Sequence, residues 1–434
     1  MRKTFVFVAF LVAAPANGQA PLPAGMRPPG CTSGLQLPAG FCATLFAEGV
    51  AGARHIVVAP NGDVYVNTEG RRGRRAQGDT ANGGILALRD TNRDGRADVQ
   101  QRFGVSGAGG TGIVLAGNMI YATVGNSIVR YRLAPGALTP TGAPDTLVTD
   151  LPMTGSHKSH NFVLQGRSLF VNIGSASNAC QQGDRQAGSP GNDPCTELET
   201  RAGIWRFDAN RLRQRQTDGS RFATGLRNSV ALTHNPIDGR LYATVHGRDQ
   251  LHDNWPQLFT AEKSAENPGE VLVRIDRNAD YGWPYCYHDF DRRGLVLAPE
   301  YGGDGQKTGQ CAKKAQALMA FPGHWAPNGM LFYTGRQFPA EYRGGAFVAF
   351  HGSWNRAPLP QAGFRVAFAP FRLKRPVGSF TTFADGFNPT PSAGRAAAGT
   401  HRPTGLAQGP DGSLYVTDDS GGSIWKVYYR GKGR

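Results

Sequence analysis

The sequence has few cysteines, few acidic residues and no long apolar run. Its six cysteines form no Cys-x-x-Cys-His motif, which excludes a covalently attached c-type haem. The longest apolar run, residues 5–14, is well short of the roughly 20 residues that a membrane-spanning helix needs. No comparable run follows, so the sequence predicts no membrane span.

The N-terminus has the pattern of a secretory signal. Arg2 and Lys3 precede the apolar run, and small residues follow it as far as Gly18. This order of charge, apolar core and small residues predicts a signal peptide at 1–18 and a secreted or periplasmic protein after cleavage. We expect residues 19–434 to form a single domain.

The cysteines fall into three pairs of sequence neighbours in a chain that we expect to enter an oxidising compartment. Three disulfides are therefore predicted, and we favour neighbour pairing, although spacing alone does not fix the connectivity. The pairs are Cys31 with Cys42, Cys180 with Cys195, and Cys286 with Cys311.

Acidic residues are outnumbered, with 32 Asp and Glu against 47 Lys and Arg, and the formal net charge is +15. The basic residues are dispersed rather than gathered in runs, which is typical of a solvated basic surface. Such a charge could also attract anionic ligands or an acidic partner, but we do not expect nucleic acid binding.

A repeated unit runs through the chain: a turn, an alternating strand, and a second short strand. The turn and first strand recur at residues 60–66, 116–122, 165–171, 238–243, 345–349 and 411–416. The second strand follows at residues 85–88, 128–131, 204–207, 271–274, 364–366 and 424–427. Strands of β-branched and aromatic residues separated by Asn-Gly and Asp-Gly turns are hairpin signals.

A hairpin alone cannot bury its apolar face, but six such units arranged radially can. The sequence therefore predicts an all-β fold, a six-bladed β-propeller with blades of about four strands around a channel. The uneven spacing, widest between the fourth and fifth copies, predicts insertions in the loops. We expect the strand at residues 41–48 to close the ring against the last blade.

Polar residues precede three of the repeated strands and are candidates for a site at the channel mouth. His157 precedes the third copy, and a histidine there could take a proton near neutral pH or serve only as a structural residue. Arg227 and Asn228 precede the fourth copy, and Arg402 precedes the sixth at the equivalent position. The two arginines could bind an anionic group or make ordinary ion pairs.

A fourth segment matches the first half of a calcium-binding loop. Oxygen-bearing side chains stand at the first, third, fifth and ninth positions, with Gly95 at the sixth, but Gln101 takes the place of the usual glutamate. A structural calcium site and an acidic turn without metal both remain open. The candidate ligands are Asp90, Asn92, Asp94 and Asp98.

Several longer motifs in this order resemble the soluble glucose dehydrogenases that depend on pyrroloquinoline quinone (PQQ), and more closely the sorbosone dehydrogenase-like propellers. The resemblance covers nearly all of the chain after the signal. It is carried by the His157 loop with residues 170–175, and by residues 224–228, 281–284 and 351–356.

The resemblance implies a PQQ-dependent oxidoreductase that oxidises a sugar, a sugar aldehyde or a polyol and passes the electrons to a separate acceptor, a cytochrome or a quinone. It assigns His157 as the general base. It implies that PQQ is held by Arg227, Asn228 and Arg402, with Asn355 and Arg356 as further candidates. It places an active-site Ca²⁺ on Gly247 and Arg248, with Asp249 near enough to add a carboxylate.

The sequence departs from the family pattern at three positions. Ser175 stands where the family has an acidic partner for the base, so His157 must be oriented by another group or held more weakly. The cofactor-binding lysine of the glucose enzymes has no clear counterpart, the local candidates being Ser353, Asn355 and Arg356. Arg248 replaces the proline of the calcium pair.

Other assignments stay open. His160, Tyr281, Trp283 and His351 could contact substrate or only support the loops. The alternative functions are a calcium-dependent lactonase-type hydrolase and a non-enzymatic binding propeller. Acidic residues are scarce at the predicted blade entrances, which counts against the hydrolase.

Overall fold

The structure, a computed structural model, describes residues 31, 33–70, 83–105, 108–394 and 400–431. The predicted signal peptide, residues 1–18, lies outside the described residues. Strands dominate the described part of the chain, in which the only α-helices are the short α1 (Leu251–Asn254) and α2 (Ala261–Glu266).

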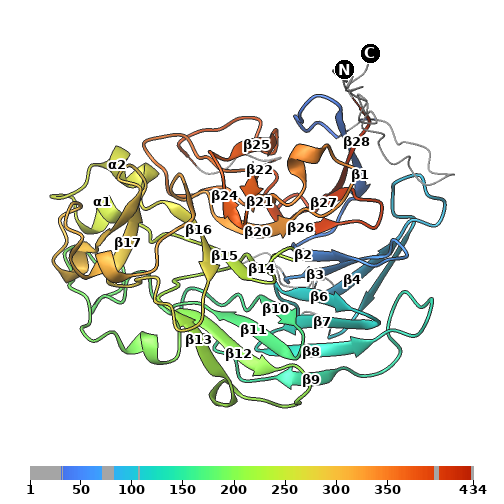
Figure 1. The fold of residues 1–434 in the computed structure, drawn as a ribbon, viewed down its shortest axis with the longest axis horizontal. Helices are drawn as coiled ribbons and strands as arrows, with labels where there is room; N and C mark the ends of the chain where they lie inside the picture. The colour runs from blue at the N-terminus through green and yellow to red at the C-terminus, as the bar shows by residue number, and fades with distance from the viewer. Residues whose placement is uncertain (1–30, 32, 71–82, 106–107, 395–399, 432–434) are drawn as a thin grey trace, which may run out of the picture.

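Six antiparallel four-stranded sheets follow one another around a ring, as the colours of Figure 1 show. This arrangement confirms the predicted six-bladed β-propeller. Blade 1 comprises β2 (Ala53–Val58), β3 (Val64–Thr68), β4 (Gly84–Arg89) and β5 (Val99–Phe103); blade 2, β6 (Ile113–Ala116), β7 (Met119–Val124), β8 (Ser127–Arg132) and β9 (Asp145–Val148); and blade 3, β10 (Phe162–Gln165), β11 (Ser168–Ile173), β12 (Gly203–Asp208) and β13 (Ser220–Thr224). Blade 4 comprises β14 (Leu232–His234), β15 (Leu241–Val245), β16 (Glu270–Ile275) and β19 (Met319–Phe321); blade 5, β20 (Pro327–Phe332), β21 (Ala346–Phe350), β22 (Arg365–Ala369) and β25 (Thr381–Ala384); and blade 6, β26 (Pro403–Gln408), β27 (Leu414–Asp418), β28 (Ile424–Tyr429) and β1 (Phe41–Ala47).

The repeated unit of the sequence corresponds to the second and third strands of every blade. Second strands such as β3, β11, β15, β21 and β27 are buried along their whole length. Each lies inside a sheet that packs against neighbouring blades on both faces, so most of its side chains are apolar or small, with Asn67, Asn172 and Asp418 as buried exceptions. This double burial is why these strands stand out in the sequence.

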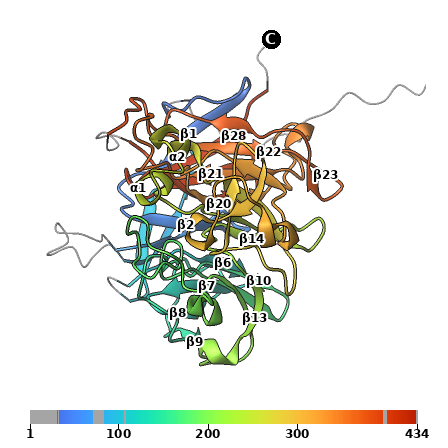
Figure 2. The same ribbon diagram turned by 90° about the vertical axis from the view of Figure 1, so that its left-hand side faces the viewer.

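The strand β1 closes the ring, as predicted, by pairing antiparallel with β28. Phe41 lies opposite Tyr429 in this pair, and its ring packs edge-on against Phe338 and Phe383, with centroids 4.8 and 5.0 Å away. Figures 1 and 2 both show the blue β1 beside the red β28. The last blade therefore combines the first strand of the described chain with the last three.

The predicted insertion between the fourth and fifth copies forms a small lobe. It contains α1, α2 and the hairpin of β17 (Cys286–Asp289) and β18 (Gly294–Leu297), which lie together at the left edge of Figure 1. Leu251, Phe259 and Tyr287 belong to its own apolar cluster. A second hairpin, β23 (Phe371–Arg372) with β24 (Arg375–Pro376), extends blade 5.

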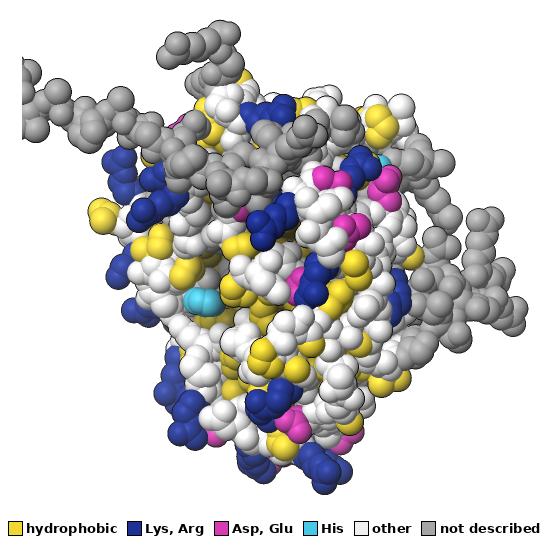
Figure 3. All heavy atoms as spheres, turned by 90° about the vertical axis from the view of Figure 1, so that its right-hand side faces the viewer, with side chains coloured by type: hydrophobic (Ala, Val, Ile, Leu, Met, Phe, Trp, Pro, Cys, Tyr) yellow, Lys and Arg dark blue, Asp and Glu magenta, His cyan; other side chains and the backbone are white. Residues whose placement is uncertain are grey.

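All three predicted disulfides are present, with the neighbour pairing that we favoured: Cys31–Cys42, Cys180–Cys195 and Cys286–Cys311. Within the residues that the structure describes, no helix is both long and apolar enough to cross a membrane. Lys and Arg side chains are scattered over the face shown in Figure 3 rather than gathered into one patch, in line with their dispersal along the sequence.

Candidate active site

Strand direction brings the predicted site residues to one end of the propeller. In each antiparallel blade, the segment entering the first strand and the segment joining the second strand to the third lie at the same end. We call this end the entry mouth. Three of the predicted segments precede first strands: His157 precedes β10, Arg227 and Asn228 precede β14, and Arg402 precedes β26. Two others follow second strands: Gly247–Asp249 follow β15, and Asn355 and Arg356 follow β21.

His157 is held through one ring nitrogen. Its Nδ1 lies 2.9 Å from Ser175 Oγ and 3.0 Å from the Ser175 carbonyl oxygen. The Ser175 hydroxyl donates to the carbonyl of Ser177 at 2.7 Å, so both oxygens facing Nδ1 are acceptors. The proton therefore sits on Nδ1, and Nε2 carries the free lone pair.

Burial and then the nearby positive charge of Arg227 hold the pKa of His157 well below its ordinary value. The imidazole is consequently neutral at neutral pH. A neutral imidazole with an unprotonated Nε2 is the form that a general base requires.

A carboxylate supports this arrangement from one step further away. Glu197, in the short 3-10 helix Thr196–Glu199, accepts hydrogen bonds from the backbone N–H of Ala176 at 2.6 Å and of Ser177 at 3.2 Å, and from the Ser177 hydroxyl. Glu197 thereby fixes the segment that presents Ser175 to His157. This residue was not predicted from the sequence; the only signal was its place two residues after Cys195, just outside the loop that the Cys180–Cys195 disulfide closes.

Arg227 lies buried beside Asp249. Its guanidinium donates to the carbonyl of Gly247 at 2.7 Å, to Asn178 Oδ1 at 2.9 Å and to Asp249 Oδ2 at 3.0 Å. Asn178 Oδ1 also accepts the backbone N–H of Asp249 at 2.9 Å. Asn178 thus joins two predicted site segments, although the sequence analysis did not single it out.

Asp249 is bonded to several side chains of the entry mouth. Besides Arg227, it accepts hydrogen bonds from Arg185 at 3.0 Å and from Asn355 Nδ2 at 2.9 Å, while His324 Nδ1 lies 3.6 Å away. Although burial opposes ionisation, Arg227 and His324 hold the pKa of Asp249 well below its usual range. Asn355 is therefore brought to the predicted calcium segment.

Arg248 extends away from this cluster. Its buried guanidinium forms an ion pair with the buried Glu300, which also accepts a hydrogen bond from Trp255 Nε1 at 2.9 Å. The side chain of Arg248 is thus engaged in the lobe, whereas Gly247 and Asp249 contact Arg227.

Arg402 is held on the other side of the entry mouth. It donates to the carbonyl of Ser353 at 3.0 Å and lies 3.4 Å from Nδ1 of His351. His351 Nε2 is 2.8 Å from Asp419, which also binds Arg54 at 2.6 Å. His351 therefore supports Arg402, which matches the loop-support alternative for this residue.

Several other candidates are engaged in backbone contacts. Arg356 donates to the carbonyls of Ala265, Gly323 and Pro360 at 2.8, 3.1 and 3.2 Å. The remaining three form hydrogen bonds with backbone groups of the described structure. His160 contacts the carbonyls of Asn172 and Pro152, and Trp283 contacts that of Asn178. The Tyr281 hydroxyl donates to the carbonyl of Arg274 and accepts from the N–H of Asp276. These contacts are those of residues that hold loops in place.

The calcium-like loop lies at the opposite end of the propeller, because it joins the third strand β4 to the fourth strand β5. Asp90 accepts the backbone N–H of Gly95 at 2.9 Å, and Asp98 that of Thr91 at 3.1 Å; Asp94 accepts a hydrogen bond from Asn92 at 3.1 Å. No group of three His, Cys, Asp or Glu placed to hold a metal occurs in the described parts of the chain. The loop is thus closed by its own hydrogen bonds.

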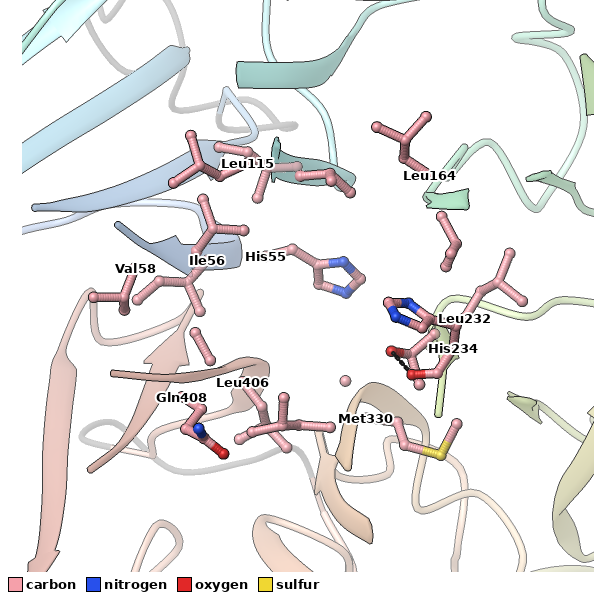
Figure 4. A pocket seen from close by; sticks show the side chains of 18 of the residues that line it. His55, Ile56, Val58, Leu115, Leu164, Leu232, His234, Met330, Leu406 and Gln408 are labelled. Carbon is pink, nitrogen blue, oxygen red and sulfur yellow. Dashed lines mark hydrogen bonds between the residues drawn. The ribbon is translucent and has the colours of Figure 1, made fainter. Parts of the chain in front are cut away.

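The channel also opens at the opposite end, where the first strands of all six blades line a cavity of about 490 Å³. Figure 4 shows its apolar lining, including Leu115 and Met330, with the rings of His55 and His234 inside it. Burial lowers the pKa of both histidines, to about 4 for His55. The candidate residues of the entry mouth do not line this cavity.

Comparison with known proteins agrees with the fold. The PQQ domain of the pyranose dehydrogenase of Coprinopsis cinerea, in its holo form, superposes with a TM-score of 0.71 at 21% identity, covering 93% of this chain and 99% of that one. The calcium structure of the Trichoderma reesei enzyme of carbohydrate-active family AA12 gives 0.72 at 18% identity, covering 95% and 99%. At these identities the likeness shows the fold.

Sequence relatives cover different shares of the chain. An uncharacterised protein of Borreliella burgdorferi is 31% identical over 208 residues, or 48% of each chain. The PQQ-dependent pyranose dehydrogenase of Coprinopsis cinerea is 28% identical over 262 residues, 52% of this chain but only 34% of that protein. The match therefore spans half or less of the length of these relatives.

A longer match connects the chain with a PQQ-dependent sugar dehydrogenase of Hypocrea jecorina, 24% identical over 407 residues, or 88% of this chain and 86% of that protein. The family model described as TrAA12-like matches residues 35–430. These findings confirm the predicted resemblance to soluble PQQ-dependent sugar dehydrogenases, and the chain belongs to the TrAA12-like family.

Proposed function

We propose that this protein is a PQQ-dependent oxidoreductase that oxidises a hydroxyl group of a sugar, sugar aldehyde or polyol and passes the electrons to a separate acceptor. One observation carries the proposal: a half-buried histidine with a free Nε2 and a lowered pKa lies at the same mouth as two arginines. Family membership and the PQQ-dependent relatives support it.

The donor set of the entry mouth fits PQQ and Ca²⁺. Arg227 and Arg402 would attract the carboxylates of PQQ through their positive charge, since four of the five N–H groups of Arg227 already donate to Asn178, Gly247 and Asp249. Two buried amide oxygens, Asn228 Oδ1 and Asn355 Oδ1, have no hydrogen-bond partner among the described residues. Unpartnered oxygens are the ligands that a hard cation prefers, and Gly247, Arg248 and Asp249 lie in the segment that would hold Ca²⁺.

In this mechanism the bound PQQ supplies a two-electron acceptor for the hydride that leaves the substrate carbon. His157 takes the hydroxyl proton on Nε2 while its Nδ1–H stays bonded to Ser175. Ser175 keeps the ring in one orientation, and burial together with Arg227 keeps the imidazole neutral before the reaction. Carbon–hydrogen and oxygen–hydrogen bonds break and a carbonyl group forms, so the substrate loses two electrons and two hydrogens.

The hydrolase alternative has less support. A hydrolytic calcium site needs several side-chain oxygens converging on the ion. The carboxylates of the entry mouth are instead engaged by the protein itself: Asp249 and Asp419 by arginines, Asp418 by His401, and Glu270 by the backbone N–H groups of Gly247 and Ala326. We therefore favour redox chemistry and, with three disulfides present, propose export to the periplasm or the exterior.

The test is to reconstitute the purified protein with PQQ and Ca²⁺ and to follow dye reduction with sugars, sorbosone and polyols. We expect substrate-dependent reduction that needs both additions. His157→Ala should lower kcat by roughly 100-fold or more while the Kd of PQQ stays within about twofold, because a general base contributes about that much to the rate. A variant that retains turnover would remove His157 from the mechanism, and a wild-type protein that does not bind PQQ would end the proposal.

A further inference from the structure

Trp354 is an exposed aromatic residue at the entry mouth. Its side chain is 63% exposed, whereas the other tryptophans of the described chain are at least half-buried. It follows β21, in the segment that joins the second and third strands of blade 5, on the same end as His157 and Arg402. A large, rigid aromatic ring that is open to solvent beside a polar site is available to pack against a ligand.

The residues on both sides of Trp354 are bonded to the site. The carbonyl of Ser353 accepts a hydrogen bond from Arg402 at 3.0 Å, and Asn355 Nδ2 donates to Asp249 at 2.9 Å. Ser353 Oγ is in turn fixed by Gln361 at 2.6 Å. The backbone that carries the ring is therefore held in place before any ligand arrives, which lowers the entropic cost of binding on it.

We propose that Trp354 is the stacking surface for the ring of a cyclic sugar and thereby selects ring-form sugars over open-chain polyols. This inference rests on the proposed function. A pyranose ring presents a rigid face of C–H groups that can pack on an indole, while its hydroxyls reach the polar groups around Arg402 and Asp249. An open-chain polyol has no rigid face, because its carbon chain rotates freely and would lose that freedom on binding.

The experiment compares sugars with their own reduced forms, D-glucose with D-sorbitol and D-xylose with xylitol, in the holoprotein. Trp354→Ala removes the ring and Trp354→Phe keeps a smaller one. Leu373→Ala is the control, since Leu373 is 90% exposed in the β23–β24 hairpin, which joins the third and fourth strands at the opposite end. Saturation-transfer NMR measures sugar binding without turnover, and steady-state kinetics give separate KM values for the sugar and the acceptor.

We expect Trp354→Ala to raise the KM and Kd for both cyclic sugars by roughly 2- to 12-fold, the value of an aromatic contact. The KM and Kd of Trp354→Phe should lie between those of Trp354→Ala and the wild type, and those of Leu373→Ala should equal the wild-type values. The weaker binding of the polyols should not change in any variant.

Three results would overturn the inference. One is an equal loss of affinity for sugars and polyols in Trp354→Ala. Another is an unchanged sugar KM with a raised KM for the acceptor, which would make Trp354 an acceptor contact. The third is unaltered saturation transfer to the sugar. If the wild type binds cyclic sugars on Trp354 but reduces no dye, the oxidoreductase proposal fails and this inference stands.

Discussion

Single hydrogen bonds decide which nitrogen of His157 is reactive. Ser175 faces Nδ1 with two acceptor oxygens, because its own hydroxyl proton goes to Ser177. A serine can therefore set the tautomer of the base as an acidic residue would. It adds no negative charge, however, and the hydrogen bond to the Ser175 carbonyl raises the pKa of His157 by less than burial lowers it.

Ser175→Asp should raise the pKa of His157, by roughly one unit or more, since a carboxylate beside an imidazole favours its charged form. The reaction needs the neutral form, so the acidic limb of the kcat/KM profile should move to higher pH. Ser175→Ala keeps the backbone carbonyl contact and should leave the limb near its original position. An acidic limb that does not move in Ser175→Asp would mean that another group is titrating.

Glu197→Gln should lower kcat by roughly tenfold with little change in the Kd of PQQ. The amide brings a donor toward a site where Ala176, Ser177 and the Ser177 hydroxyl are already donors, which loosens the support of Ser175. Glu199→Gln in the same 3-10 helix is exposed and serves as the control. Equal kinetics for the two variants would show that Glu197 does not position His157.

Among the elements, β1 has a special role because it completes blade 6 from the other end of the chain. Its aromatic contacts join three parts of the fold: Phe338 follows β20, Phe383 lies in β25, and Tyr429 ends β28. The strand thus binds blades 5 and 6 together at the point where the ring closes.

Phe41→Ala should lower the free energy of unfolding by about 3 kcal/mol, the usual cost of truncating a packed phenylalanine. Phe371→Ala in the β23–β24 hairpin removes a similarly half-buried ring that packs on Tyr242 and Phe332 without closing the ring of blades. Denaturant unfolding should show a larger decrease in the free energy of unfolding for Phe41→Ala than for Phe371→Ala. If Phe41→Ala lowered the free energy of unfolding by less than Phe371→Ala does, closure of the ring of blades would contribute little to stability.

The elements that could be predicted from the sequence are those with a pattern that burial imposes. Second and third strands are apolar because blades cover them, and they were found in all six blades. Outer strands such as β5 (Val99–Phe103) and β13 (Ser220–Thr224) are largely exposed, so polar residues occupy them and no pattern marks them. The sequence did not predict three site residues, for another reason. Their hydrogen-bond partners are distant in sequence, and only the folded loops bring the partners together. These residues are Glu197, Asn178 and Asp419.

For the whole molecule, a buried acid links stability to pH. Burial raises the pKa of Glu270 to about 7, although hydrogen bonds from the N–H groups of Gly247 and Ala326 oppose the shift. Asp249 and His324 are its charged neighbours. In the unfolded chain this glutamate ionises near pH 4.3, so between that pH and about 7 only the unfolded state has lost the proton.

The contribution of Glu270 to the free energy of unfolding should therefore fall as pH rises from about 4.5 to about 7. Glu270→Gln cannot ionise, so its stability should decline less over this range, by on the order of 2 kcal/mol. Urea unfolding at pH 5 and pH 7.5 measures this, with the exposed Glu341→Gln as control. An identical pH dependence in Glu270→Gln and the wild type would contradict the assignment.

The pairing of β1 with β28 also dictates an order of events during synthesis. β1 is made before every other described strand, but its partner β28 is made after all of them. Until then β1 is an unpaired edge, and unpaired edges invite association with other chains. A chain cut short by a premature stop lacks β28 and leaves both the ring and β1 open. We therefore expect a chain truncated before β28 to yield aggregated rather than partly active protein.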